Sequence, residues 1–485
     1  MARLITTIFL CSLAFGCQST RDVSSAYRDA TYAGDRYKTS DRTSVLFLVD
    51  GLSSEMLTTA LRAGTVPQMA NAFTLSSKAR FPLGRAQFPS LTFPNITSVL
   101  TNSSVADHAI TGNRVVLDGR ITNFENVSNW PDLARTLQRR TVFAKLSEQS
   151  ESSVSYAYAF SGGATAYLDK SIEAGFGYLE NDYASIDSST LLSLKKLLVD
   201  TPSNRWPRFI FVHLIGVDAI AHKYGPTDER VQTYLEDLDA NLGEIFAVLD
   251  HPEGLAVSNH SVNYALTADH GFRATPLHSP LADVVANLSS RKLRLIPDNR
   301  IAPLWFQEPA TDDQKLSLVT SLVEVPHVGL AVVKSETALD ILRRSPAGVI
   351  TRSRISFADG PCPDKEAAAH LEILSGVQKP SPQEAKIFTC LSQFDRTAAA
   401  DDDYQIPALV DYFANPESPD AVFIADENSD FADGYAGNHG GLTREEMLVP
   451  VLTKDVELPR GVSPTYKLLE FMGVTTPPPA NPPAK

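Results

Sequence analysis

Residues 208–226, RFIFVHLIGVDAIAHKYGP, join in one stretch the two patterns that decide the fold. The stretch opens with a mostly apolar run, which is typical of a strand in a parallel sheet that helices cover on both faces. It continues with Asp218 and His222, which are four residues apart and therefore project from one face of a helical turn. Gly225 and Pro226 then end the turn. The stretch predicts a buried strand followed by a helix that carries two polar side chains.

Further apolar runs end abruptly in polar residues, and helical patterns lie between them. The runs are SVLFLVDG (44–51), NYALTADHG (263–271) and DAVFIADE (420–427), and two of the helical patterns are EMLTTALRAG (55–64) and DERVQTYLEDLDANLGEIFAVLD (228–250). Strands that alternate with helices predict an α/β fold, in which a mostly parallel sheet is sandwiched between helices. Ligands of such sheets bind beyond the carboxyl ends of the strands.

The pattern changes between residues 291 and 404, where we expect an inserted α+β cap subdomain. Residues 299–307 and 328–335 are expected to be strands, and residues 362–376 and 381–394 to be helices. In chain order, the predicted organisation begins with a leader at 1–17 and a flexible tether at 18–43. The α/β core follows at 44–290 and 405–475, with the insert at 291–404 between its two parts, and a proline-rich tail lies at 476–485.

The first residues, MARLITTIFLCSLAFGC, read as an export signal. Arg3 precedes an apolar run that is too short to span a bilayer, and small residues precede Cys17. The end of this run, LAFGC, resembles the lipobox of bacterial lipoproteins, in which the cysteine is acylated. We therefore expect a periplasmic protein whose membrane contact is a lipid anchor at Cys17. A signal that is cleaved without lipidation is the alternative.

Composition excludes some partners. With 485 residues and 43% hydrophobic content the chain can bury a large core, and its formal net charge of −14 argues against binding of a nucleic-acid polymer. Cys11 and Cys17 belong to the leader, which leaves Cys362 and Cys390 either to pair in an oxidising compartment or to stay as buried thiols. The oligomeric state is left open.

Six carboxylate and imidazole residues form a candidate metal centre. Asp50, Asp218, Asp269 and His270 follow apolar runs, although each alone is also a common loop starter or cap. Together with His222 and His439 they would supply three ligands to each of two metals, and this mixed set suits zinc or a similar divalent ion.

Thr92, in FPSLTFPNITSVLTN (88–102), has two interpretations. A threonine before a helical pattern is usually a helix cap. Beside two metal ions it becomes a candidate nucleophile, because a metal ion and a helix N-terminus both stabilise an alkoxide.

The series Asp50-Gly51, TFPN (92–95), DxxxHxxGP (218–226), DHG (269–271) and HGG (439–441) resembles the alkaline phosphatase superfamily. It is most similar to the nucleotide pyrophosphatase/phosphodiesterase (type I phosphodiesterase) branch, and the likeness covers roughly residues 44–455. HLIGVDAIAHKYGP is also similar to ethanolamine-phosphate transferases. The resemblance implies one zinc on Asp218, His222 and His439 and another on Asp50, Asp269 and His270, Thr92 as covalent nucleophile and metal ligand, and Asn113 as a contact to a phosphate oxygen.

We therefore expect a metal-dependent phosphodiesterase that acts on a small phosphate ester through a phosphothreonine. A phosphomonoesterase, a phosphoethanolamine-type transferase and a metal-binding protein without catalysis are the alternatives, and the substrate stays open. The uncharged segment VSYAYAFSGGATAYL (154–168) favours a pocket for a second ester group. Arg114 would favour monoesters, but in an extended strand it would point away from Asn113. The backbone N–H of Phe93 and the amide of Asn113 are expected to stabilise charge in the transition state.

Overall fold

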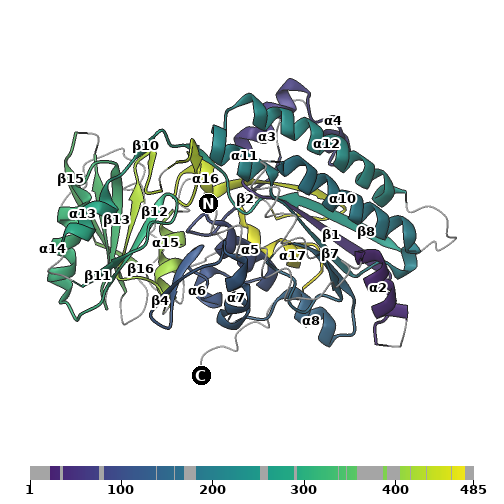
Figure 1. Ribbon diagram of the computed structural model, residues 1–485, viewed down its shortest axis with the longest axis horizontal. Coiled ribbons are helices and arrows are strands. Elements are labelled where there is room, and N and C mark those ends of the chain that lie inside the picture. The colour runs from purple at the N-terminus through teal and green to yellow at the C-terminus, as the bar shows by residue number, and fades with distance from the viewer. Residues whose placement is uncertain are drawn as a thin grey trace, which may run out of the picture.

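The protein is described by a computed structural model, which shows two lobes (Figure 1). The described residues are 22–32, 36–75, 81–137, 139–157, 159–168, 182–251, 260–288, 292–336, 338–345, 347–357, 386–389, 405–415, 417–432, 434–459 and 461–475. The predicted leader, Cys362, Cys390, the predicted helix at 362–376 and the proline-rich tail lie outside them.

The larger lobe is built on an eight-stranded sheet, ordered β21-β2-β20-β8-β1-β7-β5-β6. Strand β1 (Arg42–Val49) lies between β7 (Phe209–Leu214) and β8 (Ser261–Thr267) and is parallel to both. Strand β5 (Ser153–Tyr156) continues the parallel order, and β20 (Leu448–Lys454) is antiparallel to β8. The predicted mostly parallel sheet is confirmed.

Helices cover both faces of this sheet, and alternation along β1 shows how. Val45 and Phe47 point to one apolar cluster, while Leu46 and Leu48 point to the other. The first face is covered by α3 (Ser54–Ala63), α10 (Tyr183–Asp200), α11 (Gly216–Tyr224) and α12 (Glu229–Asp250), and the second by α5 (Thr92–Thr101), α8 (Val142–Glu148) and α17 (Leu468–Phe471) (Figure 1).

Shorter elements complete this lobe. They are α4 (Pro67–Ala72), β2 (Leu83–Arg85), α6 (Val105–His108), β3 (Arg114–Leu117), β4 (Arg120–Asn123), α7 (Trp130–Thr136), β6 (Ala166–Tyr167), β9 (Arg273–Ala274), β19 (Gly437–Asn438), α16 (Arg444–Met447) and β21 (Ser463–Pro464).

The smaller lobe is a seven-stranded sheet, ordered β11-β12-β17-β13-β14-β15-β16. Its strands are β11 (Leu293–Leu295), β12 (Ile301–Phe306), β13 (Val328–Lys334), β14 (Ala338–Arg344), β15 (Ile350–Phe357), β16 (Lys386–Thr389) and β17 (Ala421–Ala425). Helices α13 (Leu281–Asn287), α14 (Asp312–Val323) and α15 (Gln405–Ala414) and the short strands β10 (Leu277–His278) and β18 (Ser429–Asp430) accompany it. The strands predicted at 299–307 and 328–335 are confirmed.

The insert is longer than predicted at both ends. Strand β17, expected to resume the core sheet, lies between β12 and β13 and is antiparallel to both. On its C-terminal side α15 packs into the same lobe, because Leu409 and Phe413 share a cluster with Val332. On its N-terminal side Leu281 of α13 also belongs to this lobe. An apolar strand that is buried on both faces has the same sequence pattern in either kind of sheet, so the pattern of 420–427 could not decide between them.

Two further predictions are wrong. Residues 386–389 form strand β16, parallel to β15, within the helix expected at 381–394. Within the expected tether, residues Val23–Tyr32 form helix α2. The Tyr27 side chain of this helix is buried, and its hydroxyl lies 2.8 Å from Ser152 Oγ and donates to Arg205 O at 2.9 Å. Val23 and Tyr27 are four residues apart on one helix face, and burying that pair fixes the helix against the core.

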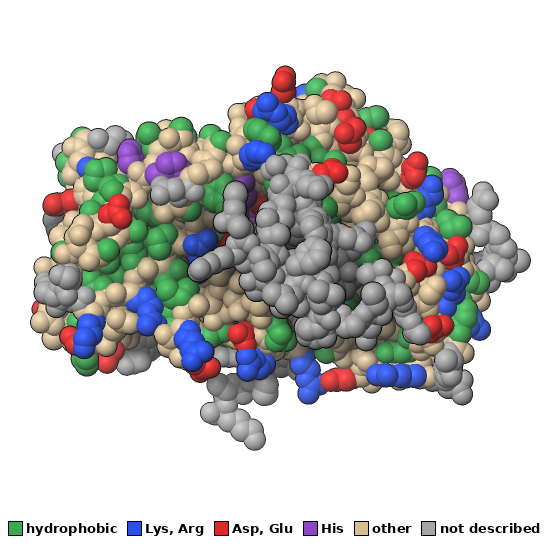
Figure 2. Space-filling model, in the orientation of Figure 1, with side chains coloured by type: hydrophobic (Ala, Val, Ile, Leu, Met, Phe, Trp, Pro, Cys, Tyr) green, Lys and Arg blue, Asp and Glu red, His purple; other side chains and the backbone are tan. Residues whose placement is uncertain are grey.

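The surface carries mixed charge. Figure 2 shows acidic and basic side chains interspersed along the lower edge of the face that it draws. Exposed ion pairs such as Lys195 with Glu244 are part of this surface. Within the described residues, no helix combines the length and the apolar character that crossing a membrane would need.

One buried ion pair joins the two lobes. Arg300, just before β12, donates through Nη1 to Glu446 Oε2 at 2.5 Å, and both side chains are buried. Arg300 also donates to Ser429 O and Asp426 O, beyond β17. Glu446 accepts from Gly441 N at 2.7 Å and from the Thr443 hydroxyl at 2.8 Å. The pair therefore ties the insert to the loop that follows β19.

Replacing Arg300 by methionine should destabilise the protein strongly. The change leaves Glu446 as a buried charge without its cation, which costs about 3–5 kcal/mol in the free energy of unfolding. Urea unfolding followed by circular dichroism measures the loss. Lys195→Met, which breaks an exposed pair, is the control and should cost less than about 1 kcal/mol. An Arg300→Met protein as stable as this control would contradict the prediction.

Candidate active site

The predicted metal ligands converge at one edge of the larger sheet. Asp50 follows β1, Asp218 and His222 lie on α11 directly after β7, and Asp269 and His270 follow β8. Because these strands are parallel neighbours, their carboxyl ends meet at the same edge. His439 follows β19, which pairs with β9 just beyond His270. The six ligands thus come together from segments almost 400 residues apart in the chain.

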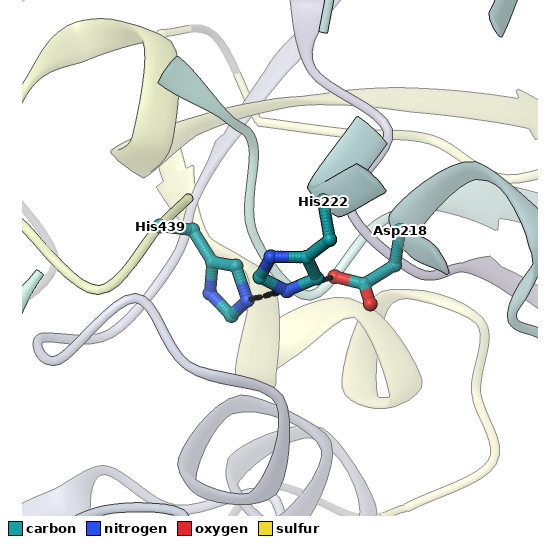
Figure 3. Close-up of side chains that lie close together, drawn as sticks. All are labelled: Asp218, His222 and His439. Carbon is teal, nitrogen blue, oxygen red and sulfur yellow. Dashed lines mark hydrogen bonds and ion pairs between the residues drawn. The ribbon is translucent and has the colours of Figure 1, made fainter. Parts of the chain in front are cut away.

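The first ligand group is Asp218, His222 and His439, whose ligand atoms lie within 4.8 Å of one another. His222 Nε2 is 3.1 Å from His439 Nε2 and 3.5 Å from Asp218 Oδ1 (Figure 3). The Nδ1 atom of each ring contacts a backbone carbonyl oxygen: His222 Nδ1 lies 3.0 Å from Gly437 O, and His439 Nδ1 lies 2.9 Å from Ser90 O. Donation from each Nδ1 leaves a lone pair on each Nε2, as a metal ligand requires.

The second ligand group is Asp50, Asp269 and His270. His270 Nε2 lies 3.4 Å from Asp50 Oδ1 and 3.3 Å from Asp269 Oδ2. The Gly51 N–H donates to Asp269 Oδ1 at 3.2 Å. The two groups adjoin, because the rings of His270 and His439 stack with their centroids 3.6 Å apart. The grouping implied by the resemblance is therefore the grouping seen in space.

The donor set fits divalent cations. Asp50 Oδ1, Asp218 Oδ1 and Asp269 Oδ2 are buried and have no hydrogen-bond partner among the described residues. Burial, with Asp269 as the next cause, raises the pKa of Asp50 and of Asp218 well above the usual range. Burial also lowers the pKa of His222 to about 3. Neutral imidazoles and uncompensated carboxylates are the combination that binds a cation.

Thr92 is not a helix cap. Leu91 occupies the N-cap position of α5 with extended backbone, and Thr92 is the first helical residue. Its hydroxyl Oγ1 lies 3.1 Å from His270 Nε2, within the second ligand group. The Thr92 side chain is only partly buried. Its hydroxyl lies beside His270 and at the N-terminus of α5, which is the positive end of the helix dipole.

Asn113 contacts the first turn of α5, which carries Thr92. Its Oδ1 accepts the Phe93 N–H at 3.0 Å, and its Nδ2 donates to Glu125 Oε1 at 3.3 Å. The two groups that were expected to contact phosphate oxygens are thus bonded to each other. This bond holds the Asn113 amide against the backbone of Phe93, the residue that follows Thr92.

Arg114 does not point away from Asn113 as expected. Its Nη2 lies 3.6 Å from Glu125 Oε2, so both residues contact the same carboxylate. Strand β3 begins only at Arg114, and Asn113 therefore precedes the alternation on which the prediction relied.

Two buried residues that the sequence analysis missed position the ligands. The Nε2 atom of His213, in β7, lies 2.8 Å from Asp50 Oδ2. Asp187 of α10 accepts the N–H groups of Ile215 and Gly216 at 3.0 and 2.8 Å, and so caps the helix that carries Asp218. The only sequence signal for His213 was a histidine in an otherwise apolar strand, and Asp187 gave none.

Gly216 allows this cap to form. Asp187 also accepts from the Tyr234 hydroxyl, which approaches the start of α11 closely. A Cβ at residue 216 would lie 2.3 Å from the Tyr234 ring, so only glycine fits there.

The insert and a neighbouring loop supply the rim of the site. Asn299, in a left-handed conformation with φ of 61°, places Nδ2 3.4 Å from His439 Nε2. The Tyr435 ring lies 4.6 Å from the His222 ring and is 42% exposed. From the segment 154–168, Phe160 packs its ring 5.5 Å from that of Phe93. An aromatic ring and an amide thus flank the first ligand group.

Comparison with known proteins places this geometry in a family. The chain is 25% identical over 158 residues to GPI ethanolamine phosphate transferase 2 of Schizosaccharomyces pombe, which covers 32% of this chain and 20% of that protein. It is 23% identical over 279 residues to venom phosphodiesterase 2 of Crotalus adamanteus, which covers 54% of this chain and 32% of that protein. The chain therefore spans a third or less of the length of these curated relatives.

Among solved structures, murine ectonucleotide pyrophosphatase/phosphodiesterase 5 superposes with a TM-score of 0.57 and 14% identity, over 90% of this chain and 96% of that one. This likeness shows the shared fold. The sequence model described as type I phosphodiesterase / nucleotide pyrophosphatase matches residues 44–350, which is more than half of the 485 residues. The chain belongs to the type I phosphodiesterase / nucleotide pyrophosphatase family of the alkaline phosphatase superfamily.

Proposed function

We propose that this protein is a two-metal phosphodiesterase that works through a phosphothreonine at Thr92. The observation that carries the proposal is the contact of 3.1 Å between Thr92 Oγ1 and His270 Nε2, which puts a hydroxyl at a helix N-terminus beside the second ligand group, whose His270 ring stacks on His439 of the first. A helix cap would bond its own backbone instead. Family membership supports hydrolysis of phosphoric esters, and the Thr92 contact supports the covalent route.

The metal ions are proposed to be zinc, because two histidines with one carboxylate and two carboxylates with one histidine are ligand sets that zinc accepts. When bound, they would compensate the buried carboxylates and act as Lewis acids for the oxygens of the reaction.

The residues of the chain then have separate tasks. Thr92 Oγ1 attacks phosphorus and releases its proton to solvent, so that a Thr92 O–P bond forms as the bond to the leaving alkoxide breaks and the alkoxide takes up a proton from solvent. Water later displaces Thr92 from phosphorus and restores the hydroxyl. Asn113 Nδ2 donates one hydrogen to Glu125, and its second hydrogen would be donated to the phosphate oxygen where negative charge gathers. His213 and Asp187 keep the ligand side chains in position.

A phosphoethanolamine-type transferase is the second candidate, because a transferase is among the relatives and shares a 158-residue match. In that case an alcohol, rather than water, would accept the phospho-group from Thr92. Product analysis with increasing amounts of an added alcohol separates the two, since hydrolysis that dominates at every concentration excludes the transferase.

We also propose, from residues 1–17, that the protein works in the periplasm and is tethered through Cys17.

Metal analysis tests the ligand assignment. The protein should bind about two divalent ions per chain, chiefly zinc, and a chelator should abolish activity, because both groups consist of preformed ligands. His439→Ala should reduce the content to about one ion, as measured by elemental analysis. His278→Ala, a histidine that pairs with Asp430 outside both groups, is the control. Full activity in metal-free protein would contradict the assignment.

Thr92→Ala should keep the fold and the metal content but lose turnover by about three orders of magnitude or more, because the covalent step is removed. Steady-state kinetics, paired with elemental analysis, measures both. Thr97→Ala, in a buried position of the same helix, should retain activity. A Thr92→Ala protein with nearly normal turnover would show that Thr92 is not the nucleophile.

Catalytic efficiency should be higher for bis(p-nitrophenyl) phosphate than for p-nitrophenyl phosphate. A monoester carries close to two negative charges and a diester one, and the charge of Arg114 is offset by Glu125. Release of p-nitrophenol, followed by absorbance, gives kcat/KM for both. A higher value for the monoester would mean that the phosphodiesterase assignment is wrong.

A further inference from the structure

Glu125 is a carboxylate that contacts both Asn113 and Arg114. Oε1 accepts from Asn113 Nδ2 at 3.3 Å, and Oε2 lies 3.6 Å from Arg114 Nη2. Asn123 Nδ2 donates to Oε2 at 3.1 Å, and the Glu125 N–H donates to Asn123 Oδ1 at 2.9 Å. The side chain is 43% exposed, so it can meet a substrate that enters from solvent.

The position of Glu125 is determined by its buried neighbour. The N–H of Phe124 donates to Asn113 O at 2.8 Å, and Phe124 O accepts from Trp130 Nε1 at 3.0 Å. The Phe124 ring is fully buried, with its centroid 5.7 Å from that of Phe93. Phe93 is the residue after Thr92. The backbone that carries Glu125 is therefore packed against the turn that carries the nucleophile.

The charge of Glu125 also reaches the insert. Burial raises the pKa of Asp298 to about 7, with Glu125 as the next cause. Asp298 accepts the Arg114 N–H at 3.0 Å. A substrate phosphate that contacts Asn113 would lie in the same field.

We infer that Glu125 determines specificity by disfavouring phosphate groups with two negative charges, and that Arg114 sets the strength of this effect. The inference rests on the proposed phosphodiesterase function. Repulsion scales with the charge of the phosphate, so a dianionic monoester is penalised about twice as strongly as a monoanionic diester. Arg114 lowers the penalty by pairing with Glu125, and Glu125 in turn prevents Arg114 from acting as a free phosphate-binding cation.

Glu125→Gln tests the inference because glutamine keeps an oxygen that can accept from Asn113 and removes only the charge. The ratio of kcat/KM for bis(p-nitrophenyl) phosphate to that for p-nitrophenyl phosphate should fall about tenfold, as expected for one charge at this range. Arg114→Gln should raise the ratio. Glu148→Gln, which removes an exposed carboxylate paired with Arg140, should leave it unchanged.

Inhibition by inorganic phosphate above pH 8 supplies a second measurement that does not depend on turnover of either ester. Its inhibition constant against the diester should fall about tenfold in Glu125→Gln, because the dianion is no longer repelled. A variant that loses diester and monoester activity equally, with an unchanged phosphate inhibition constant, would assign Glu125 a structural role. If the unmodified enzyme cleaves diesters through Thr92 while the ratio stays constant in Glu125→Gln, the inference about Glu125 alone is overturned.

Discussion

Mutual repulsion among three buried carboxylates is the constraint around which the larger lobe is arranged. Asp50, Asp218 and Asp269 meet because β1, β7 and β8 are parallel neighbours whose carboxyl ends coincide. Each alone would be an ordinary strand-end residue. Brought together they repel one another, and burial together with the charge of Asp269 raises the pKa of Asp50 and of Asp218 well above the usual range. The three histidines add neutral imidazoles, so the fold assembles two groups whose donor atoms suit a divalent cation.

Groups outside the ligand set determine how rigidly these carboxylates and imidazoles are held. His213 contacts Asp50, Asp187 caps the helix that carries Asp218, and Ser90 O accepts from His439. The second lobe adds its own support, because Arg300 N donates to His439 O while the Arg300 side chain pairs with Glu446. A buried pair of this kind is weak evidence for net stability, but removing one partner leaves the other charge buried without its counter-ion. The position of His439 therefore depends on the insert as well as on the core.

The parts predicted from sequence are those where chemistry and local pattern agree. Apolar runs that end in Asp or His identified the strands of the parallel sheet, and four of the six residues that the structure brings together in two groups follow these runs, because the carboxyl ends of parallel strands meet at one edge of the sheet. The pattern failed for β17, since an apolar strand does not show which sheet it joins, and for α2, where one buried tyrosine outweighs a polar composition. It also failed for Arg114, because the start of a strand decides which residues alternate. Asp187 and Asn299 could not be found, since their roles exist only through contacts between distant segments.

The residues at the centre of the site and those at its rim differ in what they can distinguish in a substrate. In the proposed reaction the ligand groups and Thr92 provide for attack on phosphorus, and any phosphate ester presents the same phosphorus and oxygens. Esters differ in net charge and in the group beyond the bridging oxygen, and on our proposal these features meet Glu125, Arg114, Tyr435 and Asn299. These residues come from a loop after β4, the start of β3, the segment before β19 and the insert, none of which lies at the end of a parallel strand. The proposed function therefore assigns substrate choice to charge and shape at the rim, and the chemical step to Thr92 and the ligand groups.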